Sequence, residues 1–323
     1  MRLIFGMICA LALFTCAKRP PAQPTYPTLS GGAPIVIAHR GASGALPEHT
    51  LEAYTLAIQQ GADFIEPDLV MTKDGVLVAR HDRFLSTTTD VSDHPEFADR
   101  KRVQETSAGE RDDWWTEDFT LAEIKTLRAR QPYAGRSKAY DDQFEIPTFA
   151  EIVDLAIASG IGLYPETKSP SYHAAIGLDM KAPLLDALAG VQVPVFIQSF
   201  EAQILRDLDP LTEFKLVQLI SGDPRAVIAG HEPPLEQVGA YADGVGPYKQ
   251  LLWAQPGLPS DFIERAHAFG LVVHPWTFRD DNLPEHYTSS EAEIAAHLEI
   301  GVDGVFTDFP ETVAKLRRDG NKE

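Results

Sequence analysis

Short apolar segments typical of β-strands alternate along this chain with amphipathic segments typical of helices, and this alternation constrains the fold more than any other feature. The strand segments are residues 35–39, 64–70, 76–81, 161–167, 195–200, 215–220, 244–248, 271–277 and 304–307. Helices are expected between most of them, at residues 51–61, 148–160, 261–270 and 290–301. Strands that alternate with helices form a parallel sheet covered on both faces. The pattern therefore predicts a (β/α)8 TIM barrel, a fold that takes roughly 250 residues as one domain.

The strand segments number one too many for an eight-stranded barrel, and a hairpin accounts for the extra one. Only residues 71–75 separate the second segment from the third, whereas a parallel crossover needs about a dozen residues or more. The third segment is therefore predicted to run antiparallel to the second, with the Asp-Gly pair at 74–75 as the turn. With that pair at the centre of the turn, Asp68 faces His81. If the strand pairing shifts by one position, Glu66 faces His81 instead.

A polar stretch from about residue 82 to 146 interrupts the alternation of strands and helices. It contains one helical pattern, at 120–130, where Thr120 and Glu123 have the spacing of a capping box. The stretch is too long for a connecting loop, so it is predicted to be an insertion that packs over the barrel mouth and limits substrate size. The barrel domain as a whole is expected to span residues 35–323.

The amino end of the chain has the features of an export signal. Arg2 precedes about a dozen apolar residues, a run that is too short to span a bilayer and typical of a signal peptide covering residues 1–17. Two processing routes stay open, namely cleavage after Ala17 and lipidation of Cys16 within a lipobox-like sequence. The Pro-rich residues 18–34 are expected to form a tether. The sequence therefore predicts a periplasmic or cell-envelope protein.

Charge and cysteine usage exclude several functions. The formal net charge is −19 at pH 7, which disfavours binding to nucleic acids and to anionic membrane surfaces. A lipid anchor would be the one link to a membrane. Both cysteines lie in the signal segment, so the domain itself has no thiol nucleophile or thiolate metal site. An anionic substrate must therefore be bound by a local group of cations or by a metal ion held by other ligands.

Four clusters of polar side chains occur where predicted strands end, which is where barrel enzymes assemble their active sites. They comprise His39, Arg40, Glu66, Asp68, His81, Glu166 and Lys168. Three carboxylates suit Ca²⁺ or Mg²⁺. Two imidazoles can serve as general acid and general base, and the two cations can bind a phosphate. A lone histidine at a strand end is more often structural, and His49 is ambiguous, but the agreement of the four clusters indicates a metal-assisted phosphodiesterase.

The residues around these clusters resemble the signatures of the glycerophosphodiester phosphodiesterase family. The matching stretches are 39–44 with 46–54, 66–75 with 79–82 and 85–91, and 164–170, followed by weaker matches at 198–200, 275–277 and 303–308. The resemblance covers nearly all of residues 35–310. His49, where many relatives carry Asn, and the long insertion resemble the exported branch of that family.

The resemblance implies a (β/α)8 barrel that cleaves glycerophosphodiesters to sn-glycerol 3-phosphate and an alcohol. By position, the resemblance gives His39 and His81 as catalytic, Glu66, Asp68 and Glu166 as metal ligands, Arg40 and Lys168 as phosphate contacts, and Trp276 as a neighbour of the glycerol. Exported members generally use Ca²⁺, with Mg²⁺ as the alternative. Small soluble glycerophosphodiesters are the implied partners.

Several points stay open from the sequence. It does not indicate which histidine is the acid, whether water or a substrate hydroxyl attacks, which alcohol leaves, or what the oligomeric state is. One rival is a barrel phosphodiesterase that acts on intact lipids, such as a phospholipase D of the sphingomyelinase type. Another is a non-catalytic envelope binding protein on a decayed barrel, although the presence of both histidines, all three carboxylates and both cations disfavours it.

Overall fold

The computed structural model describes all residues except 1–25, 107–108, 229, 231 and 320–323. The predicted signal peptide and Cys16 therefore lie outside the described residues. Within the described ranges, none of the helices combines the length and the apolar character needed to cross a bilayer.

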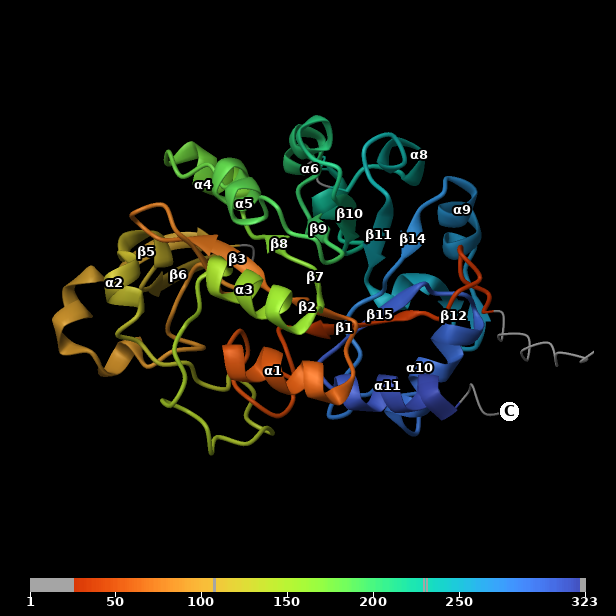
Figure 1. The fold of residues 1–323 in the computed structure, drawn as a ribbon, viewed down its shortest axis with the longest axis horizontal. Coiled ribbons are helices and arrows are strands. Elements are labelled where there is room, and N and C mark those ends of the chain that lie inside the picture. The colour runs from red at the N-terminus through yellow and green to blue at the C-terminus, as the bar shows by residue number, and fades with distance from the viewer. Residues whose placement is uncertain (1–25, 107–108, 229, 231, 320–323) are drawn as a thin grey trace, which may run out of the picture.

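Eight parallel strands form a closed barrel, as predicted (Figure 1). The strands are β1 (Ile35–His39), β2 and β3 (Phe64–Glu66 and Asp68–Met71), β7 and β8 (Gly162–Leu163 and Glu166–Thr167), β9 (Phe196–Ser199), β10 (Lys215–Ile220), β11 (Gly244–Pro247), β14 (Val272–Val273) and β15 (Gly304–Thr307). Pairing runs in this order around the barrel, and β15 pairs with β1. Bridges from Leu163 to Val195 and from Phe278 to Thr307 join the two hydrogen-bonded sheets. Aromatic and aliphatic side chains such as Phe64, Tyr164 and Phe306 fill the interior.

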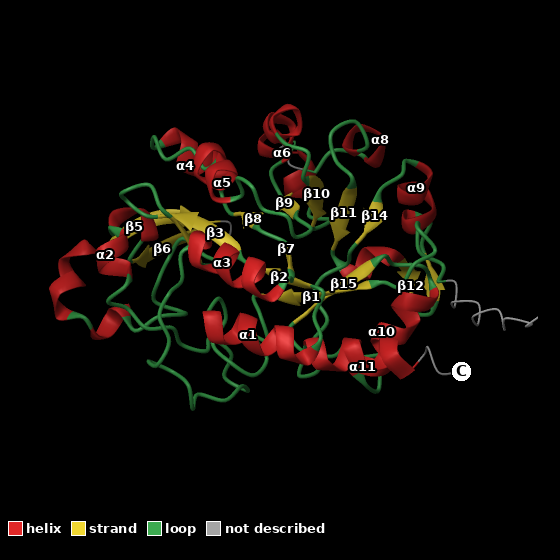
Figure 2. Cartoon of the chain, in the orientation of Figure 1, coloured by secondary structure: helices red, strands yellow, loops and turns green. Residues whose placement is uncertain are grey.

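Helices cover the outside of the barrel, mostly where the sequence predicts them (Figure 2). They are α1 (Leu51–Gln60), α3 (Phe149–Ser159), α4 (Pro170–Ala175), α5 (Lys181–Ala187), α6 (Ala202–Leu208), α7 (Pro224–Ile228), α8 (Leu235–Val238), α9 (Phe262–Ala268), α10 (Ser290–Glu299) and α11 (Pro310–Asp319). The capping box of α3 is formed by Thr148 and Glu151, and Gly160 ends the helix in the left-handed conformation (φ 68°).

The extra strand is β4 (Leu77–Ala79), which pairs antiparallel with β3 as predicted, but the predicted register is wrong. Arg80, and not His81, lies opposite Asp68, and its N–H donates to the Asp68 carbonyl (2.9 Å). The reason is the turn, which closes through a hydrogen bond from Thr72 N–H to Val76 O and includes Gly75 at φ 81°. The loop therefore holds one residue more than the Asp-Gly turn assumed in the prediction.

The insertion forms a lobe beside the barrel, at the left of Figure 1. It contains a hairpin of β5 (Arg102–Thr106) and β6 (Gly109–Asp113), and its own apolar cluster includes Phe97 and Phe119. The predicted helix at 120–130 is wrong in length, because α2 spans only Leu121–Ile124.

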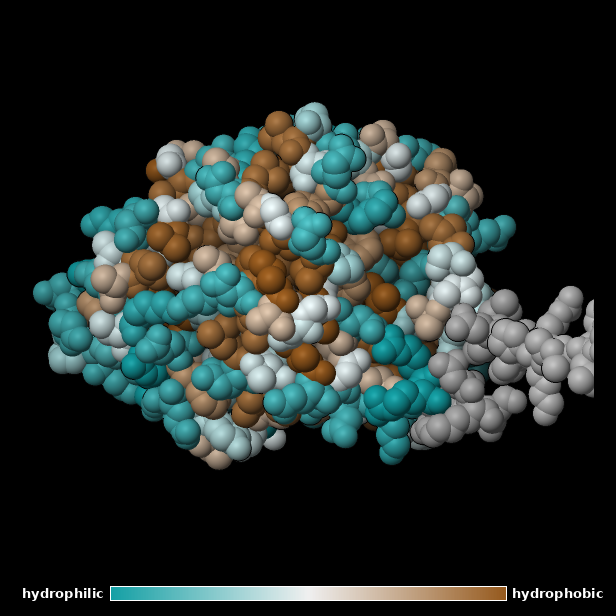
Figure 3. Space-filling view, in the orientation of Figure 1, coloured by the Kyte–Doolittle hydropathy of each residue, from teal (hydrophilic) through white to brown (hydrophobic). Residues whose placement is uncertain are grey.

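The capping box of Thr120 and Glu123 at the start of α2 is present. The helix ends early because Ala129 pairs with other segments. This residue forms a β-bridge with Thr89, and its N–H donates to Phe144 O. In the space-filling view, hydrophilic side chains cover much of the lobe, while hydrophobic ones gather toward the centre of the molecule (Figure 3).

The described end of the predicted tether lies against the barrel. Leu29 N–H donates to Asp303 Oδ1 (2.7 Å), just before β15, and a Cβ at Gly301 would come within 2.6 Å of Pro27 O. This end of the Pro-rich stretch is therefore attached to the end of the barrel opposite the carboxyl ends of the strands.

Candidate active site

The predicted site residues meet at the carboxyl end of the barrel. A cavity of about 120 Å³ lies there. The residues that line it include His39, Arg40, Glu66, His81, Glu166, Lys168 and Trp276. Asp68 lies behind this wall and contacts Arg40 and Lys168. The hairpin carries His81 into the same cavity as Glu66 and Glu166 even though the register differs from the prediction.

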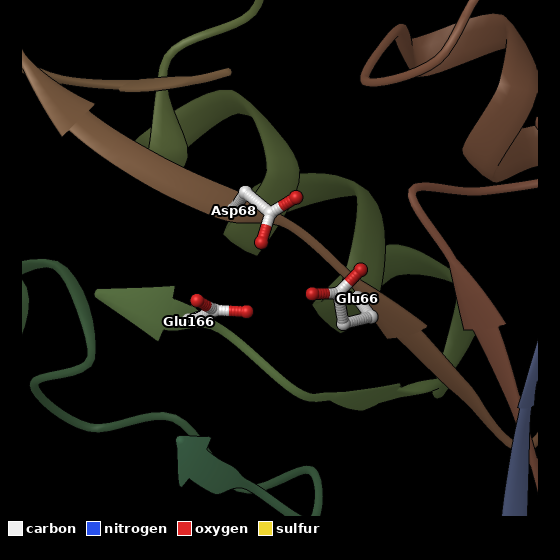
Figure 4. A group of neighbouring side chains, drawn as sticks. All are labelled: Glu66, Asp68 and Glu166. Carbon is white, nitrogen blue, oxygen red and sulfur yellow. The ribbon is translucent and has the colours of Figure 1, made fainter. Parts of the chain in front are cut away.

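Glu66, Asp68 and Glu166 point toward one another (Figure 4). Each offers an oxygen atom that lies within 4.8 Å of those of the other two, and all three residues are buried. Burial, together with the charges of Asp68 and Glu166, raises the pKa of Glu66 well above its usual range. Burial also raises the pKa of Glu166, and Asp68 adds to this effect against the opposing charge of Lys168. The cluster therefore concentrates negative charge that a cation would relieve.

Asp68 carries the fixed negative charge of the cluster. Burial alone would raise its pKa, but Lys168, a hydrogen bond from His49 and the charge of Arg40 outweigh burial and hold that pKa well below its usual range. His49 Nε2 lies 2.9 Å from Asp68 Oδ2, and its Nδ1 lies 2.8 Å from the Tyr54 hydroxyl. The histidine that the sequence left ambiguous thus orients a carboxylate of the cluster.

The donor atoms of the cluster fit a hard divalent cation. Gln198 Oε1 on β9 is buried and accepts no hydrogen bond, while Gln198 Nε2 donates to Glu66 Oε1 (3.0 Å). Asp68 Oδ1 is also buried and has Lys168 Nζ beside it at 3.3 Å. A buried oxygen atom without a hydrogen bond is rare in folded proteins and is available to a ligand. An all-oxygen set of this kind suits Ca²⁺ or Mg²⁺.

Arg40 follows β1 and has a left-handed backbone conformation, as part of a tight turn. Its φ is 59°, and that of Gly41 is 84°, where a Cβ would come within 2.7 Å of the Ala53 backbone. This turn lets the Arg40 N–H donate to Glu66 Oε2 (2.9 Å). The guanidinium pairs with Glu48 (3.0 Å) and with Asp68 (3.2 Å). Arg40 is thus held at the wall of the cavity beside the carboxylates.

His39, the last residue of β1, is oriented by Asp308, which follows β15. The two side chains are joined by a hydrogen bond of 2.7 Å between Nδ1 and Oδ1. Asp308 also accepts hydrogen bonds from Arg279 (2.8 Å) and from Arg136 of the insertion (2.5 Å). Burial, assisted by the charge of Arg40, lowers the pKa of His39 to about 4 despite the hydrogen bond to Asp308.

His81 is the more exposed of the two histidines. Its side chain is 35% exposed, against 12% for His39, and its Nδ1 lies 3.0 Å from Asp82 Oδ1. Burial and the charges of Arg40 and Lys168 lower the pKa of His81. Lys168 itself donates to Glu166 Oε1 (2.7 Å).

A second cavity, of about 550 Å³, adjoins the first. The residues that line both are His81, Glu166, Lys168 and Phe200. The insertion contributes Phe84, Thr106 and Trp115 to the wall of the larger cavity. His39 and Trp276 line the smaller cavity but not the larger one. Trp276 is fixed there by a hydrogen bond from its Nε1–H to Gly246 O (2.7 Å).

Sequence reasoning missed several residues of the site. Asp308 and Gln198 lie in the weakly matching stretches at 303–308 and 198–200, and their position after barrel strands was a signal that could have found them. Arg136 gave no signal, because nothing in the pattern of the insertion indicates contact with a residue 172 positions later.

Comparisons with known proteins give a consistent result. The family model described as "Glycerophosphoryl diester phosphodiesterase family" matches residues 39–312. A curated relative from Arabidopsis thaliana, glycerophosphodiester phosphodiesterase GDPD6, is 35% identical over 94% of this chain and 93% of its own length. The glycerophosphodiester phosphodiesterase of Haemophilus influenzae is 33% identical over 86% of this chain and 88% of its own.

Solved structures share the fold. A crystal structure of a glycerophosphoryl diester phosphodiesterase from Silicibacter pomeroyi superposes with a TM-score of 0.69 at 24% identity, covering 91% of this chain and 98% of that one. A phosphodiesterase from Oleispira antarctica, solved in complex with the product sn-glycerol-3-phosphate, gives a TM-score of 0.66 at 24% identity, with coverage of 90% and 98%.

Proposed function

The chain belongs to the glycerophosphoryl diester phosphodiesterase family, and we propose that it hydrolyses glycerophosphodiesters to sn-glycerol 3-phosphate and an alcohol with the help of a Ca²⁺ ion. The observation that carries this proposal is the single small cavity that contains carboxylates, two imidazoles and two cations. A phosphodiester needs each of these groups, because its charge must be neutralised while protons move at two oxygens. The curated relatives, which bear the name glycerophosphodiester phosphodiesterase, support the reaction.

Glu66, Asp68 and Glu166 would hold the ion. When bound, a divalent cation supplies Lewis-acid polarisation of the phosphoryl oxygens. The all-oxygen donor set suits both Ca²⁺ and Mg²⁺. We choose Ca²⁺ because the resemblance to exported members of the family implies it, and Mg²⁺ is the alternative.

Arg40 and Lys168 bind the substrate phosphate in this proposal. Both line the small cavity, and both are positioned by carboxylates of the cluster. Their positive charges lie where the phosphate oxygens gain negative charge, in a site that largely excludes water. Trp276 lines the same cavity and provides an apolar face for the carbon atoms of the glycerol.

His81 protonates the departing alcohol, and His39 deprotonates the attacking oxygen. His81 lines both cavities and is the more exposed of the two histidines, so a departing alcohol has room beside it. His39 donates its Nδ1–H to Asp308, which leaves Nε2 to accept a proton. A pKa of about 4 keeps His39 neutral near pH 7, as a general base must be. The negative phosphate opposes the lowering of the His81 pKa and favours the protonated acid.

Turnover of a soluble substrate tests the function. Protein freed of metal by a chelator should release sn-glycerol 3-phosphate from glycerophosphoethanolamine only after Ca²⁺ is added. Activity on glycerophosphocholine without detergent or vesicles should distinguish the enzyme from a barrel that requires intact lipids. Release of glycerol together with a phosphorylated alcohol, or the absence of any turnover, would contradict the proposal.

The site of action is the cell envelope in this proposal. Residues 1–17 direct export, and the protein is then either cleaved after Ala17 or anchored by a lipid on Cys16. In the anchored form, the Pro-rich residues that follow connect the anchor to the barrel.

A further inference from the structure

The two cavities differ in size, and this difference indicates which half of a substrate each cavity binds. The smaller, of about 120 Å³, holds the catalytic groups and has room for a phosphate with a three-carbon glycerol. The larger, of about 550 Å³, begins at His81 and Lys168 and extends toward the insertion. Because a glycerophosphodiester has one constant half and one variable half, the larger cavity is the place for the variable alcohol.

Three aromatic side chains contribute to the wall of the larger cavity, of which Trp115 is fully buried and two are only partly buried. Phe200, at the end of β9, lies at the boundary between the cavities, with its ring edge-on to Trp276 (5.6 Å between centroids). Phe84 comes from the insertion. Each of these two rings is only partly buried. Both rings already have a cation of the protein beside them, because the Arg111 guanidinium lies over Phe84 (3.8 Å from the centroid) and Lys168 Nζ lies 5.7 Å from the centroid of Phe200. The rings therefore give the wall an apolar surface for the carbon atoms of an alcohol.

Charges on this wall are mostly balanced by neighbours. The ion pairs are Arg83 with Glu117 (2.7 Å), Asp223 with Arg225 (2.6 Å) and Glu166 with Lys168 (2.7 Å). Asp82 is hydrogen-bonded to His81. Among the described residues Asp82 has no Lys or Arg partner, and the same is true of one further carboxylate on this wall.

That carboxylate is Glu201, which precedes α6. Among the residues that the structure describes, no Lys, Arg or His nitrogen lies within ion-pairing distance of it. Its Oε2 accepts a hydrogen bond from Ser171 N–H (3.1 Å), and its own N–H donates to Ser199 Oγ (3.2 Å). The hydrogen bond from Ser171 thus holds the Glu201 side chain, which has no ion-pair partner among the described residues, on the wall of the larger cavity.

We propose that the larger cavity binds the leaving alcohol and that Glu201 makes it selective for alcohols with a positively charged amino or ammonium group. The proposal rests on the proposed function and specifies its substrate class. A cation in this cavity gains from the Glu201 charge, in a partly enclosed site where this interaction exceeds its strength in water. An alcohol with an additional negative charge is repelled for the same reason.

Matched substrates and variants test this selectivity. The substrates are glycerophosphoethanolamine, which carries an ammonium group, and glycerophosphoglycerol, whose leaving alcohol is neutral. The variant Glu201→Gln removes the charge but keeps an oxygen that can accept the Ser171 hydrogen bond. The control is Glu213→Gln, which removes an exposed charge just before β10, at the opposite end of the barrel and beyond the reach of a screened interaction.

We expect the wild type to have a kcat/KM about three to ten times higher for the cationic alcohol. Glu201→Gln should lower this ratio to about one, chiefly by lowering kcat/KM for the cationic substrate, and Glu201→Lys should invert it. Glu213→Gln should leave the ratio unchanged. A ratio that is the same in wild type and Glu201→Gln would overturn the selectivity alone, whereas absence of turnover of both substrates by the wild type would overturn the proposed function with it.

Discussion

Asp308 Oδ1 lies 2.7 Å from Nδ1 of His39 and so determines which ring nitrogen of this histidine is free for proton transfer. Burial alone would raise the pKa of Asp308, but the hydrogen bond from His39 and the charges of Arg279 and Arg136 hold it well below the usual range. Asp308 is therefore ionised at any pH at which the enzyme works. It acts on the reaction through His39 and is a positioning residue.

Asp308→Asn should reduce kcat strongly and KM little. The amide would offer its NH₂ group to Nδ1, which stabilises the tautomer with the proton on Nε2, and Nε2 could then no longer accept one. We expect a loss of about 10²–10⁴-fold in kcat. Ca²⁺ affinity, measured by calorimetry, should be unchanged. Asp281→Asn is the control, because Asp281 also pairs with Arg136 but does not contact His39. An equal loss in both variants would indicate a structural effect.

Substitution of the carboxylates and of the histidines should have separable effects. Glu66→Ala, Asp68→Ala and Glu166→Ala should each lose both tight divalent-ion binding and activity, because each removes one of few oxygen ligands. His39→Ala and His81→Ala should keep the ion and lose about 10²–10⁴-fold in rate. Metal titration and turnover of all five variants check this. Loss of the ion in a histidine variant would identify that residue as a ligand.

An activated substrate should distinguish the two histidines. A nitrophenolate leaving group needs no proton, so a glycerophosphate nitrophenyl ester bypasses the general acid. We expect this ester to restore the rate of His81→Ala toward that of wild type and to leave His39→Ala slow. Rescue of His39→Ala but not of His81→Ala would make His39 the general acid and His81 the general base.

Stability should fall as the pH decreases from about 6.5 to 4. Burial lowers the pKa of His173, His274 and His297 to about 4. Below pH 6.5 the unfolded chain therefore takes up protons that the folded chain does not. The free energy of unfolding falls as a result until the pH reaches the pKa of these histidines in the folded chain. Each histidine should contribute on the order of 1–3 kcal/mol to this loss. Urea unfolding at pH 7 and at pH 4.5 measures the difference.

His173 offers a direct test of this acid sensitivity, because both of its ring nitrogens are buried without a hydrogen-bond partner. His173→Leu should reduce the difference in unfolding free energy between pH 7 and pH 4.5. His286→Leu, at an exposed position, is the matched control and should leave the difference as it is in wild type. If both variants behaved alike, burial of His173 would not be the cause.

Cys16→Ser should convert a membrane-fractionating protein into a soluble one. The lipid is attached through the thiol, so the variant loses its anchor while the barrel and its turnover are unchanged. Fractionation of cells that express each form, followed by activity assays, measures this. A wild type found wholly in the soluble fraction would favour cleavage after Ala17 instead.

The barrel was predictable because its strands carry local signals. β1, β10 and β15 have the predicted bounds, since apolar runs between turn residues leave little choice. Alignment of strand ends was enough to place Glu66, Asp68 and Glu166 together. The hairpin register was not predictable, because Gly75 permits a longer turn than the Asp-Gly pair suggests.

Features that depend on distant contacts were beyond the sequence. The helix after Thr120 stops at Ile124 because Ala129 pairs with Thr89, a tertiary contact that overrides local helix propensity. The partner of His39 comes from the last strand, and Arg136 reaches it from within the insertion. Contacts such as these depend on where the elements come to lie in the fold, which no local pattern encodes.

The hydrogen bond from Arg136 to Asp308 has an evolutionary consequence. A lineage that shortened the insertion would lose one of the two arginines that balance Asp308, and Arg279 alone would then face its charge. We expect residue 308 to stay an acid among homologues, and a cation from another segment to take the place of Arg136 where the insertion is short. Substrate range and proton transfer are then inherited together, so that new specificities arise more readily by substitution in the insertion than by its loss.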